Sequence, residues 1–241
     1  MPGPAAGVQL PSGRLMVGAY HGVAYNKSKQ GGEAFSFTIY SDDLGANWSW
    51  VDGHAYDVGP GAGECQIAPA PNGSLIMRTR TGRHLPPAFA WSNDNGTTWG
   101  ELVYWTNDMM HADVYQHYIY HSCSRTKPVT CQNISEFGPF GGSNTQGSIA
   151  RLPGSDLLVT SAPFAPSRAN MTLWVSSDSG KSWRIPANGH IYSLYSGYSA
   201  LVGLNATHAG VLWEVSGDPP VGNPPGSGSP FHLSYTAVKL V

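Results

Sequence analysis

Short runs of apolar and aromatic residues recur along the whole chain, separated by clusters rich in Gly, Pro, Asn, Asp and Ser. Short apolar runs bounded by such clusters predict β-strands joined by tight turns. No helix of any length is predicted. The strands are expected at residues 8–10, 14–20, 34–40, 48–51, 64–68, 75–80, 88–91, 146–152, 157–161, 171–175, 198–204, 210–215 and 231–241.

One turn pattern, S-x-D-x-G-x-x-W, occurs three times, at residues 41–48, 92–99 and 176–183. Its Ser and Asp side chains can hydrogen-bond backbone N–H groups of their own turn. The Gly permits a positive φ, and the Trp offers a small hairpin one large apolar anchor. A turn that repeats implies a repeated supersecondary unit. The pattern's aspartates are Asp43, Asp94 and Asp178.

The spacing of the repeats suits a β-propeller. The interval from residue 43 to residue 94 fits one four-stranded blade, and the interval from 94 to 178 fits one blade with a long insertion or two short blades. The pattern resembles the Asp box of sialidases and related propellers. The resemblance implies an all-β propeller of sialidase type, six-bladed when complete, with about four blades here and the N-terminal blades missing. Residues 1–241 are then one sialidase-like domain.

The bulk composition agrees with an all-β domain and excludes several functions. Charged residues are 12%, while Gly 30 and Pro 19 are high. A net charge of −2 gives no reason to expect nucleic acid as a partner. No apolar run approaches the roughly 18 residues of a membrane-spanning helix, and residues 1–4 do not begin a signal peptide.

The cysteines and glycosylation sequons bear on the cellular compartment. Cys123 and Cys131 lie in one polar stretch and could close a short disulfide, which leaves Cys65 as a buried thiol. Sequons of the form N-x-S/T favour a secretory or lysosomal parent protein. They begin at Asn26, Asn47, Asn72, Asn95, Asn133, Asn170 and Asn205.

Residues 104–144 show no strand pattern, and their length suggests a functional or family-specific insertion. His111, His117 and His121 lie there, but the segment carries no helix signal that would bring the last two onto one face, so no metal site is predicted. The Gly-rich stretches lack the lysine of a phosphate loop. No cofactor is expected.

Glu64 is the first candidate for chemistry, because it follows a glycine-rich turn and opens a strand. Glu64-Cys65-Gln66 resembles the Glu-Cys-Gln or Glu-Ser-Gln segment of sialidases, in which an arginine follows on the return strand. Arg80 holds that place, with Arg78 and Arg83 as rivals, and Arg78 and Arg80 share a strand face. Arg168, before the third Asp box, resembles another sialidase arginine. Guanidinium groups bind a carboxylate in a bidentate manner, which suits a sialic acid.

Tyr198 resembles the sialidase nucleophile, with Tyr195 as its rival. A phenol is neutral until it is deprotonated, so it avoids the repulsion that a carboxylate nucleophile would meet from the substrate carboxylate. It needs a neighbouring base, which would be Glu64. By the same resemblance, Glu214 orients an active-site arginine and Tyr20 lies near the substrate side chain.

The resemblance implies an exo-α-sialidase that releases terminal sialic acid from glycoproteins, glycolipids or oligosaccharides with retention. The family's first arginine belongs to an Arg-Ile-Pro segment; residues 184–186 spell it, but directly after an Asp box, so the match is read as coincidence. The general acid Asp that follows that segment is also missing. A non-catalytic Asp-box propeller and a sialidase-like lectin stay as alternatives. Linkage preference and oligomeric state do not follow from the sequence.

Overall fold

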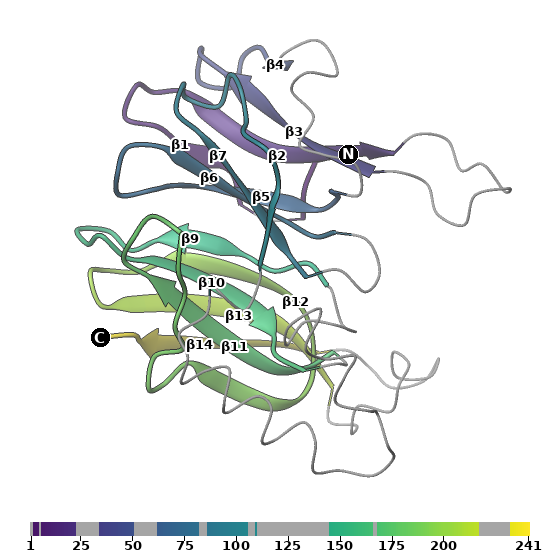
Figure 1. Cartoon of the computed structure of the whole chain (residues 1–241), viewed down its shortest axis with the longest axis vertical. Coiled ribbons are helices and arrows are strands. Elements are labelled where there is room, and N and C mark those ends of the chain that lie inside the picture. Colours follow the sequence, from purple (N-terminus) through teal and green to yellow (C-terminus); the bar gives the residue numbers. More distant parts are fainter. Residues whose placement is uncertain are drawn as a thin grey trace, which may run out of the picture.

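The computed structural model describes residues 2–4, 6–22, 34–50, 62–81, 86–105, 109, 145–165, 168–216 and 232–241. These residues form fourteen strands in three antiparallel sheets. Figure 1 shows the first two sheets in the upper half of the molecule and the third in the lower half. Within the described residues no helix is long and apolar enough to cross a membrane. The all-β fold that the sequence predicts is therefore confirmed.

The first two sheets each have four strands that follow one another in sequence order. The first sheet contains β1 (Val8–Gln9), β2 (Leu15–Gly22), β3 (Ala34–Ser41) and β4 (Ser49–Trp50). The second sheet contains β5 (Cys65–Pro69), β6 (Leu75–Thr79), β7 (Ala88–Ser92) and β8 (Val103–Tyr104).

The third sheet has six strands in the order β14-β13-β12-β11-β10-β9, because one long strand joins two hairpin units. The first half of β12 pairs with β11 and its second half pairs with β13. Two of the four expected blades are therefore the separate four-stranded sheets, and the other two are merged in the six-stranded sheet. The strands are β9 (Ile149–Arg151), β10 (Leu158–Pro163), β11 (Ala169–Ser176), β12 (His190–Gly203), β13 (His208–Ser216) and β14 (His232–Lys239).

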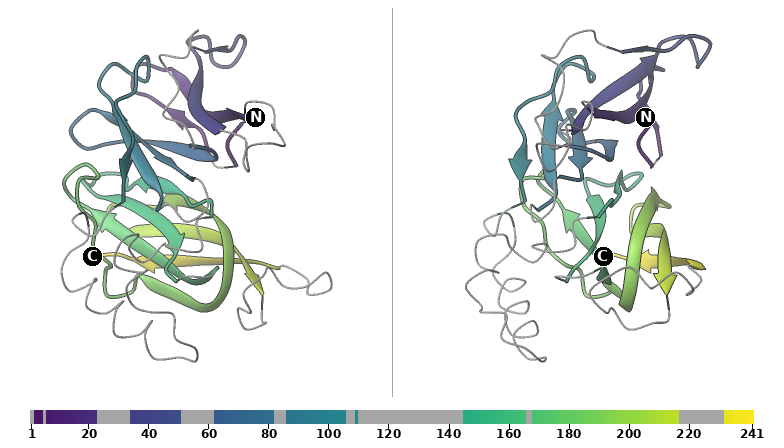
Figure 2. Two further views of the ribbon diagram at one scale, coloured as in Figure 1. Left: turned by 45° about the vertical axis from the view of Figure 1, so that its right-hand side comes forward. Right: turned by 90° about the vertical axis from the view of Figure 1, so that its right-hand side faces the viewer.

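Neighbouring sheets contact one another through their first or second strands, as the blades of a propeller do. β5 contacts β2 and β1, β9 contacts β5, and β12 contacts β9. Figure 2 shows the same stacking from two further directions. The strand ends on one side of these neighbouring strands are consequently close together, although they are far apart in the sequence.

Two strands differ from the sequence prediction. β12 begins at His190, not at Tyr198, because serines and a glycine interrupt its apolar pattern and a register shift separates Ser196 from Ser199. β8 is a pair of residues that borders β7 in a stretch where no strand was expected. Two residues are too few to produce an alternating pattern.

The largest aromatic cluster fills the space between the second and third sheets. Phe89, Trp105, Trp174 and Trp183 are fully buried there, and the Phe89 and Trp183 rings stack with centroids 5.4 Å apart. Trp183 is the tryptophan of the third Asp box, so it is the apolar anchor that the motif predicts. Trp48 of the first box is 43% exposed, which makes the anchoring prediction wrong for that copy.

The three Asp boxes share one hydrogen-bond pattern at the turn that follows the third strand of a unit. In the first box the Ser41 hydroxyl donates to Asp43 Oδ1 (2.7 Å), Gly45 N donates to Ser41 Oγ (2.8 Å), and Asn47 N donates to Asp43 Oδ1 (2.8 Å). The bonds from Asn47 N and the Ser41 hydroxyl lower the pKa of Asp43 to about 2. Gly45 has a φ of +93°, which an L side chain rarely adopts.

We expect Asp178→Ala to lower the free energy of unfolding by about 1–2 kcal/mol, because Ser182 N, Ser182 Oγ and Ser176 Oγ all donate to this carboxylate. Thermal or urea unfolding measures the change. Asp156→Ala is the matched control, since its carboxylate is 82% exposed and makes one ion pair with Arg151 at 3.3 Å. Equal losses in the two variants would contradict the structural role of the Asp box.

The lowered pKa of Asp43 predicts where its contribution is lost on acidification. A carboxyl whose folded pKa lies below its unfolded value of about 3.9 stabilises the fold above that value and stops doing so as the pH falls through the folded pKa. The stability difference between the wild type and Asp43→Ala should be constant above about pH 5 and shrink as the pH approaches 2. Urea unfolding at a series of pH values checks this; a difference that grows on acidification would contradict it.

Candidate active site

Glu64 and Arg80 lie opposite each other at the open end of the β5–β6 hairpin. Gly63 N donates to the Arg80 carbonyl (2.7 Å) and Arg80 N donates to the Glu64 carbonyl (2.8 Å), so the pairing continues beyond both strands. The two side chains form an ion pair, with Arg80 Nη1 2.7 Å from Glu64 Oε2. Both are only partly buried, with 29% of the Arg80 side chain and 15% of the Glu64 side chain exposed. The pair is therefore within reach of a ligand.

Tyr198 comes to this pair from β12, on the neighbouring sheet. Its hydroxyl donates to Glu64 Oε1 at 2.5 Å, and Arg80 Nη1 donates to the same phenol oxygen at 3.0 Å. Oε1 of Glu64 thus accepts from Tyr198, and Oε2 accepts from Arg80. The structure brings together three of the residues that the sequence singled out, across 134 positions of the chain in the case of Glu64 and Tyr198.

Arg168 lies beside the same tyrosine. Its guanidinium carbon is 5.8 Å from the centroid of the Tyr198 ring, and its carbonyl accepts a hydrogen bond from Ser196 N (2.9 Å). No carboxylate within the described part of the chain forms an ion pair with Arg168. The guanidinium is consequently available to an anionic ligand above the Tyr198 ring.

A buried polar network sets the distance between Glu64 and Tyr198. Gln66 Oε1 accepts hydrogen bonds from Ser148 Oγ (2.5 Å) and Ile149 N (3.0 Å), and Leu201 N donates to Ser148 Oγ (2.8 Å). These bonds tie β5, β9 and β12 together. Glu64 is two residues before Gln66, and Tyr198 is three residues before Leu201. The network therefore fixes the two strand ends that carry the reactive groups.

Glu214 supports Tyr198 through the backbone. Its Oε2 atom accepts a hydrogen bond from Tyr198 N at 3.0 Å, at the register shift in β12. In the described residues Glu214 has no arginine partner, so its predicted role in orienting an arginine stays a prediction. Gly197 lets the carboxylate approach, because a Cβ on this residue would overlap Glu214 Oε2. The sequence reasoning missed Gly197, although a glycine inside a strand often marks a close approach.

The surroundings of Tyr198 keep its phenol protonated. Burial and the hydrogen bond to the Glu64 carboxylate raise its pKa to about 12, while Arg80 and Arg168 oppose the rise. Burial is the largest single effect on the pKa of Arg80 and lowers it, but the hydrogen bond and charge of Glu64, together with Tyr198, outweigh burial and the net shift is upward. The guanidinium groups of Arg80 and Arg168 both lie beside the phenol. The carboxylates of Glu64 and Glu214 accept hydrogen bonds from Tyr198. The arrangement suits an anionic ligand next to a phenol nucleophile with an adjacent base.

The rival residues lie elsewhere. Arg78 shares a strand face with Arg80, as predicted, but it is completely buried between sheets and does not reach Glu64. Tyr195 is also buried, opposite Ser216 in β13, away from the Glu64 carboxylate. Tyr20 lies in β2 opposite Ser36, whose hydroxyl donates to the Gly63 carbonyl (2.7 Å), so it borders the site from the first sheet. Its contact with a substrate stays a prediction.

The remaining sequence predictions have mixed outcomes. Cys65 is a buried free thiol, as expected, and burial raises its pKa to about 12. Arg184 bridges to Val175 directly after the third Asp box, away from the site residues. Arg83, the three histidines at 111, 117 and 121, and the cysteines at 123 and 131 lie outside the described residues. Within the described ranges no group of His, Cys, Asp or Glu is placed to hold a metal ion.

Sheets whose hairpins carry Asp boxes and whose first strands lie side by side define an Asp-box β-propeller chain. A sequence model of the BNR repeat-like domain family matches residues 1–202. The match covers most of the 241 residues, so the chain belongs to the BNR repeat-like domain family. The resemblance to sialidases that the sequence predicts is confirmed by this match and by the relatives that follow.

Three of the proteins that this chain resembles are sialidases by name. The anhydrosialidase of Macrobdella decora is 38% identical over 105 residues, which are 42% of this chain and 12% of that protein. The Hadza microbial sialidase Hz136 matches with a TM-score of 0.64 and 21% identity over 100% of this chain and 38% of its own. The Trypanosoma rangeli sialidase in complex with 2,3-difluorosialic acid, a covalent intermediate, matches with a TM-score of 0.59 and 20% identity over 97% of this chain and 30% of its own. At such identities the structural likeness establishes the fold alone.

We expect Gly197→Ala to destabilise the fold by about 1–3 kcal/mol, because the added methyl group overlaps Glu214 Oε2 and displaces the carboxylate that accepts the hydrogen bond from Tyr198 N. The displacement should also move Tyr198 away from Glu64. Thermal unfolding measures the first effect. Gly100→Ala is the matched control, since a Cβ there meets only the Trp91 carbonyl at 3.5 Å. Equal stability of the two variants would show that Gly197 is not required.

Proposed function

We propose that the chain carries the nucleophile half of a retaining exo-α-sialidase site, which acts on terminal sialic acids of glycoproteins, glycolipids or oligosaccharides. The observation that carries the proposal is the contact of Tyr198 Oη with Glu64 Oε1 at 2.5 Å and with Arg80 Nη1 at 3.0 Å. A non-catalytic propeller has no need of a phenol that donates to a carboxylate beside two arginines. The family membership and the sialidase relatives support the same function.

In the first half of the proposed reaction, Glu64 accepts the phenol proton and Tyr198 Oη attacks the anomeric carbon of the sialoside. A bond forms between that carbon and Oη, and the bond to the leaving oxygen breaks. The leaving oxygen takes a proton from a general acid, for which the described residues offer no assigned group. In the second half, water adds to the anomeric carbon and gives up one proton to the group that had protonated the leaving oxygen. The bond to Tyr198 Oη breaks, and the proton on Glu64 returns to the phenol oxygen.

The arginines give the proposed site its preference for a sialic acid. The substrate carries its carboxylate on the anomeric carbon, next to the bond that breaks. Arg168 and Arg80 flank Tyr198 and would bind that carboxylate, and a planar guanidinium matches two carboxylate oxygens at once. A neutral phenol can approach the same carbon without the like-charge repulsion that a carboxylate would meet.

The chain spans 38% of the Hadza sialidase and 12% of the anhydrosialidase. The activity of those whole proteins is therefore part of the proposal and not a finding on this chain. A third arginine and a general acid are expected from other residues of the complete site. A secretory or lysosomal location is likewise a proposal, which rests on the N-x-S/T sequons.

The product distinguishes two reaction outcomes. Hydrolysis releases free sialic acid, whereas the name of the Macrobdella decora relative points to an anhydro form, in which a hydroxyl of the sugar itself replaces water as the acceptor. Both outcomes pass through attack on the same carbon, so the contact between Tyr198 and Glu64 serves either. Chromatography of the released sugar separates the two.

The test is release of 4-methylumbelliferone from its sialic acid glycoside, by this chain and by a version extended upstream in its gene. In an active form, Tyr198→Phe should lower kcat by a factor on the order of 10² to 10⁴, while a sialic acid analogue still binds. Tyr192→Phe is the matched control, because it removes only a hydroxyl that donates to the Ser216 carbonyl at 3.2 Å.

Full turnover by Tyr198→Phe would rule out this nucleophile. Sialic acid binding without turnover in either form of the chain would favour a lectin. Neither binding nor turnover would leave only the Asp-box propeller and its protein-binding alternative.

A further inference from the structure

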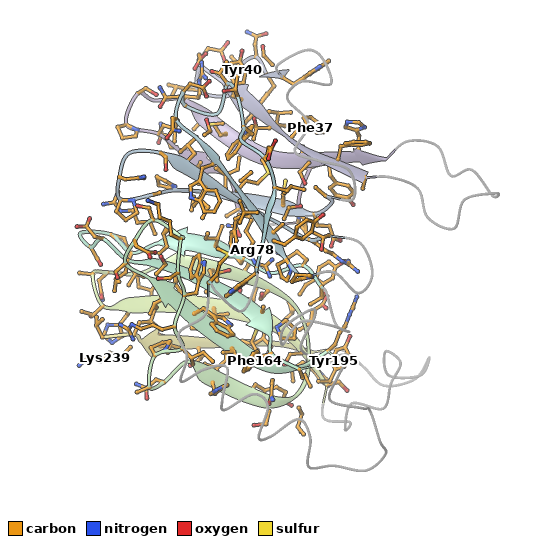
Figure 3. All side chains as sticks on the ribbon, in the orientation of Figure 1. Phe37, Tyr40, Arg78, Phe164, Tyr195 and Lys239 are labelled. Carbon is orange, nitrogen blue, oxygen red and sulfur yellow. The ribbon has the colours of Figure 1, made fainter. Side chains whose placement is uncertain are left out.

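Arg78 is a fully buried cation in the middle of the molecule. It lies in β6, opposite Gln66 of β5 and Phe89 of β7, and its exposed fraction is 0%. Figure 3 shows its label at the boundary between the upper sheets and the six-stranded sheet. Phe89, its neighbour across the strand pair, belongs to the aromatic cluster between those sheets. The surroundings of Arg78 are therefore dry.

The guanidinium of Arg78 has no counter-charge among the described residues. None of its three nitrogens has a hydrogen-bond partner there, and no carboxylate in the described ranges forms an ion pair with it. Burial lowers its pKa to about 9, which still leaves it protonated at neutral pH. A buried charge without a partner is strongly destabilising, and an arginine can only donate hydrogen bonds. The group needs an acceptor that carries negative charge.

A second buried donor lies in the neighbouring segment before β9. The backbone of Gly147 lies against Arg78, since a Cβ at this glycine would overlap the guanidinium. Gln146 and Ser148, on either side of this glycine, both bond to β12, through Ser199 and Leu201. Thr145 is two residues before Gly147, and its Oγ1 is buried without a hydrogen-bond partner among the described residues.

We propose that Arg78 and Thr145 hold a small monovalent inorganic anion, such as chloride, between the second sheet and the six-stranded sheet. The anion accepts N–H bonds from the guanidinium and the O–H bond of the threonine, which satisfies both groups at once. A monovalent anion fits better than sulfate or phosphate because the dry surroundings penalise each further charge. This site is separate from the one at Glu64, where Arg80 already has a carboxylate partner.

The site has a structural consequence that needs no sialic acid. An anion held between β6 and the segment before β9 stabilises the contact of the second and third sheets. Because a ligand that binds only the folded state raises its stability, the melting temperature should depend on the anion in the buffer. The proposal therefore succeeds or fails independently of the proposed enzymatic activity.

The experiment measures thermal unfolding of this chain in chloride, bromide and gluconate at constant ionic strength. We expect Tm to rise on the order of 3 °C for each tenfold increase in chloride or bromide above the dissociation constant, and not in gluconate. Arg78→Met should remove the dependence, whereas Arg151→Met, which removes an arginine from a surface pair with Asp156, should retain it. Thr145→Val should weaken the apparent anion affinity about tenfold.

A direct measurement covers the case in which Arg78→Met does not fold. Crystals soaked in bromide should give an anomalous peak within hydrogen-bond distance of the Arg78 guanidinium. A wild-type Tm that is the same in chloride and gluconate would overturn the proposal and indicate a carboxylate of the same polypeptide as the counter-charge. An empty position beside Arg78 in the bromide map would overturn it as well.

Discussion

The hydrogen bonds from the Ser148 hydroxyl to Gln66 Oε1 and from Leu201 N to the Ser148 hydroxyl are the constraint on which the candidate site depends. They join strands from three units of the fold at its centre, where water cannot replace a lost partner. A buried amide oxygen that loses its donors costs free energy, so the relative shift of these strands is strongly specified. Glu64 and Tyr198 are only a few residues from this network, so their positions are fixed by it. A loop would not hold the two side chains at so constant a distance.

Under the proposed function, the electrostatics of the site favour proton transfer from Tyr198 only when charge develops on the substrate. The Glu64 carboxylate raises the pKa of Tyr198 and the two arginines lower it, with a net value of about 12. A bound substrate carboxylate would offset the arginines and raise the phenol pKa further. Under the proposed function, the phenol therefore loses its proton as positive charge grows on the anomeric carbon, and not before. This order protects the nucleophile from premature ionisation.

The sequence predicts what depends on local chemistry and misses what depends on neighbours in space. The Asp-box turns and the hairpins follow from turn residues, whereas the choice of Arg80 as the partner of Glu64 rests on a resemblance to sialidases. Tyr198 follows from a resemblance to sialidases, and the structure brings it to Glu64. The early start of β12 and the exposure of Trp48 do not follow, because an interrupted strand is completed by its partners and burial depends on what packs above. Gly197 matters only because Glu214 lies against it.

Arg78 and Arg80 show what the two-residue period of a strand predicts about side chains and what it does not. The period of two places both side chains on one face of the sheet, as the sequence predicts. The face, however, changes its surroundings along the strand: at Arg78 it is fully covered, while at Arg80 it opens to solvent beside Glu64. The outer arginine thus has a carboxylate partner and reaches a ligand. The inner one carries the same charge where the described residues supply no ion-pair partner, which is the observation behind the proposed anion.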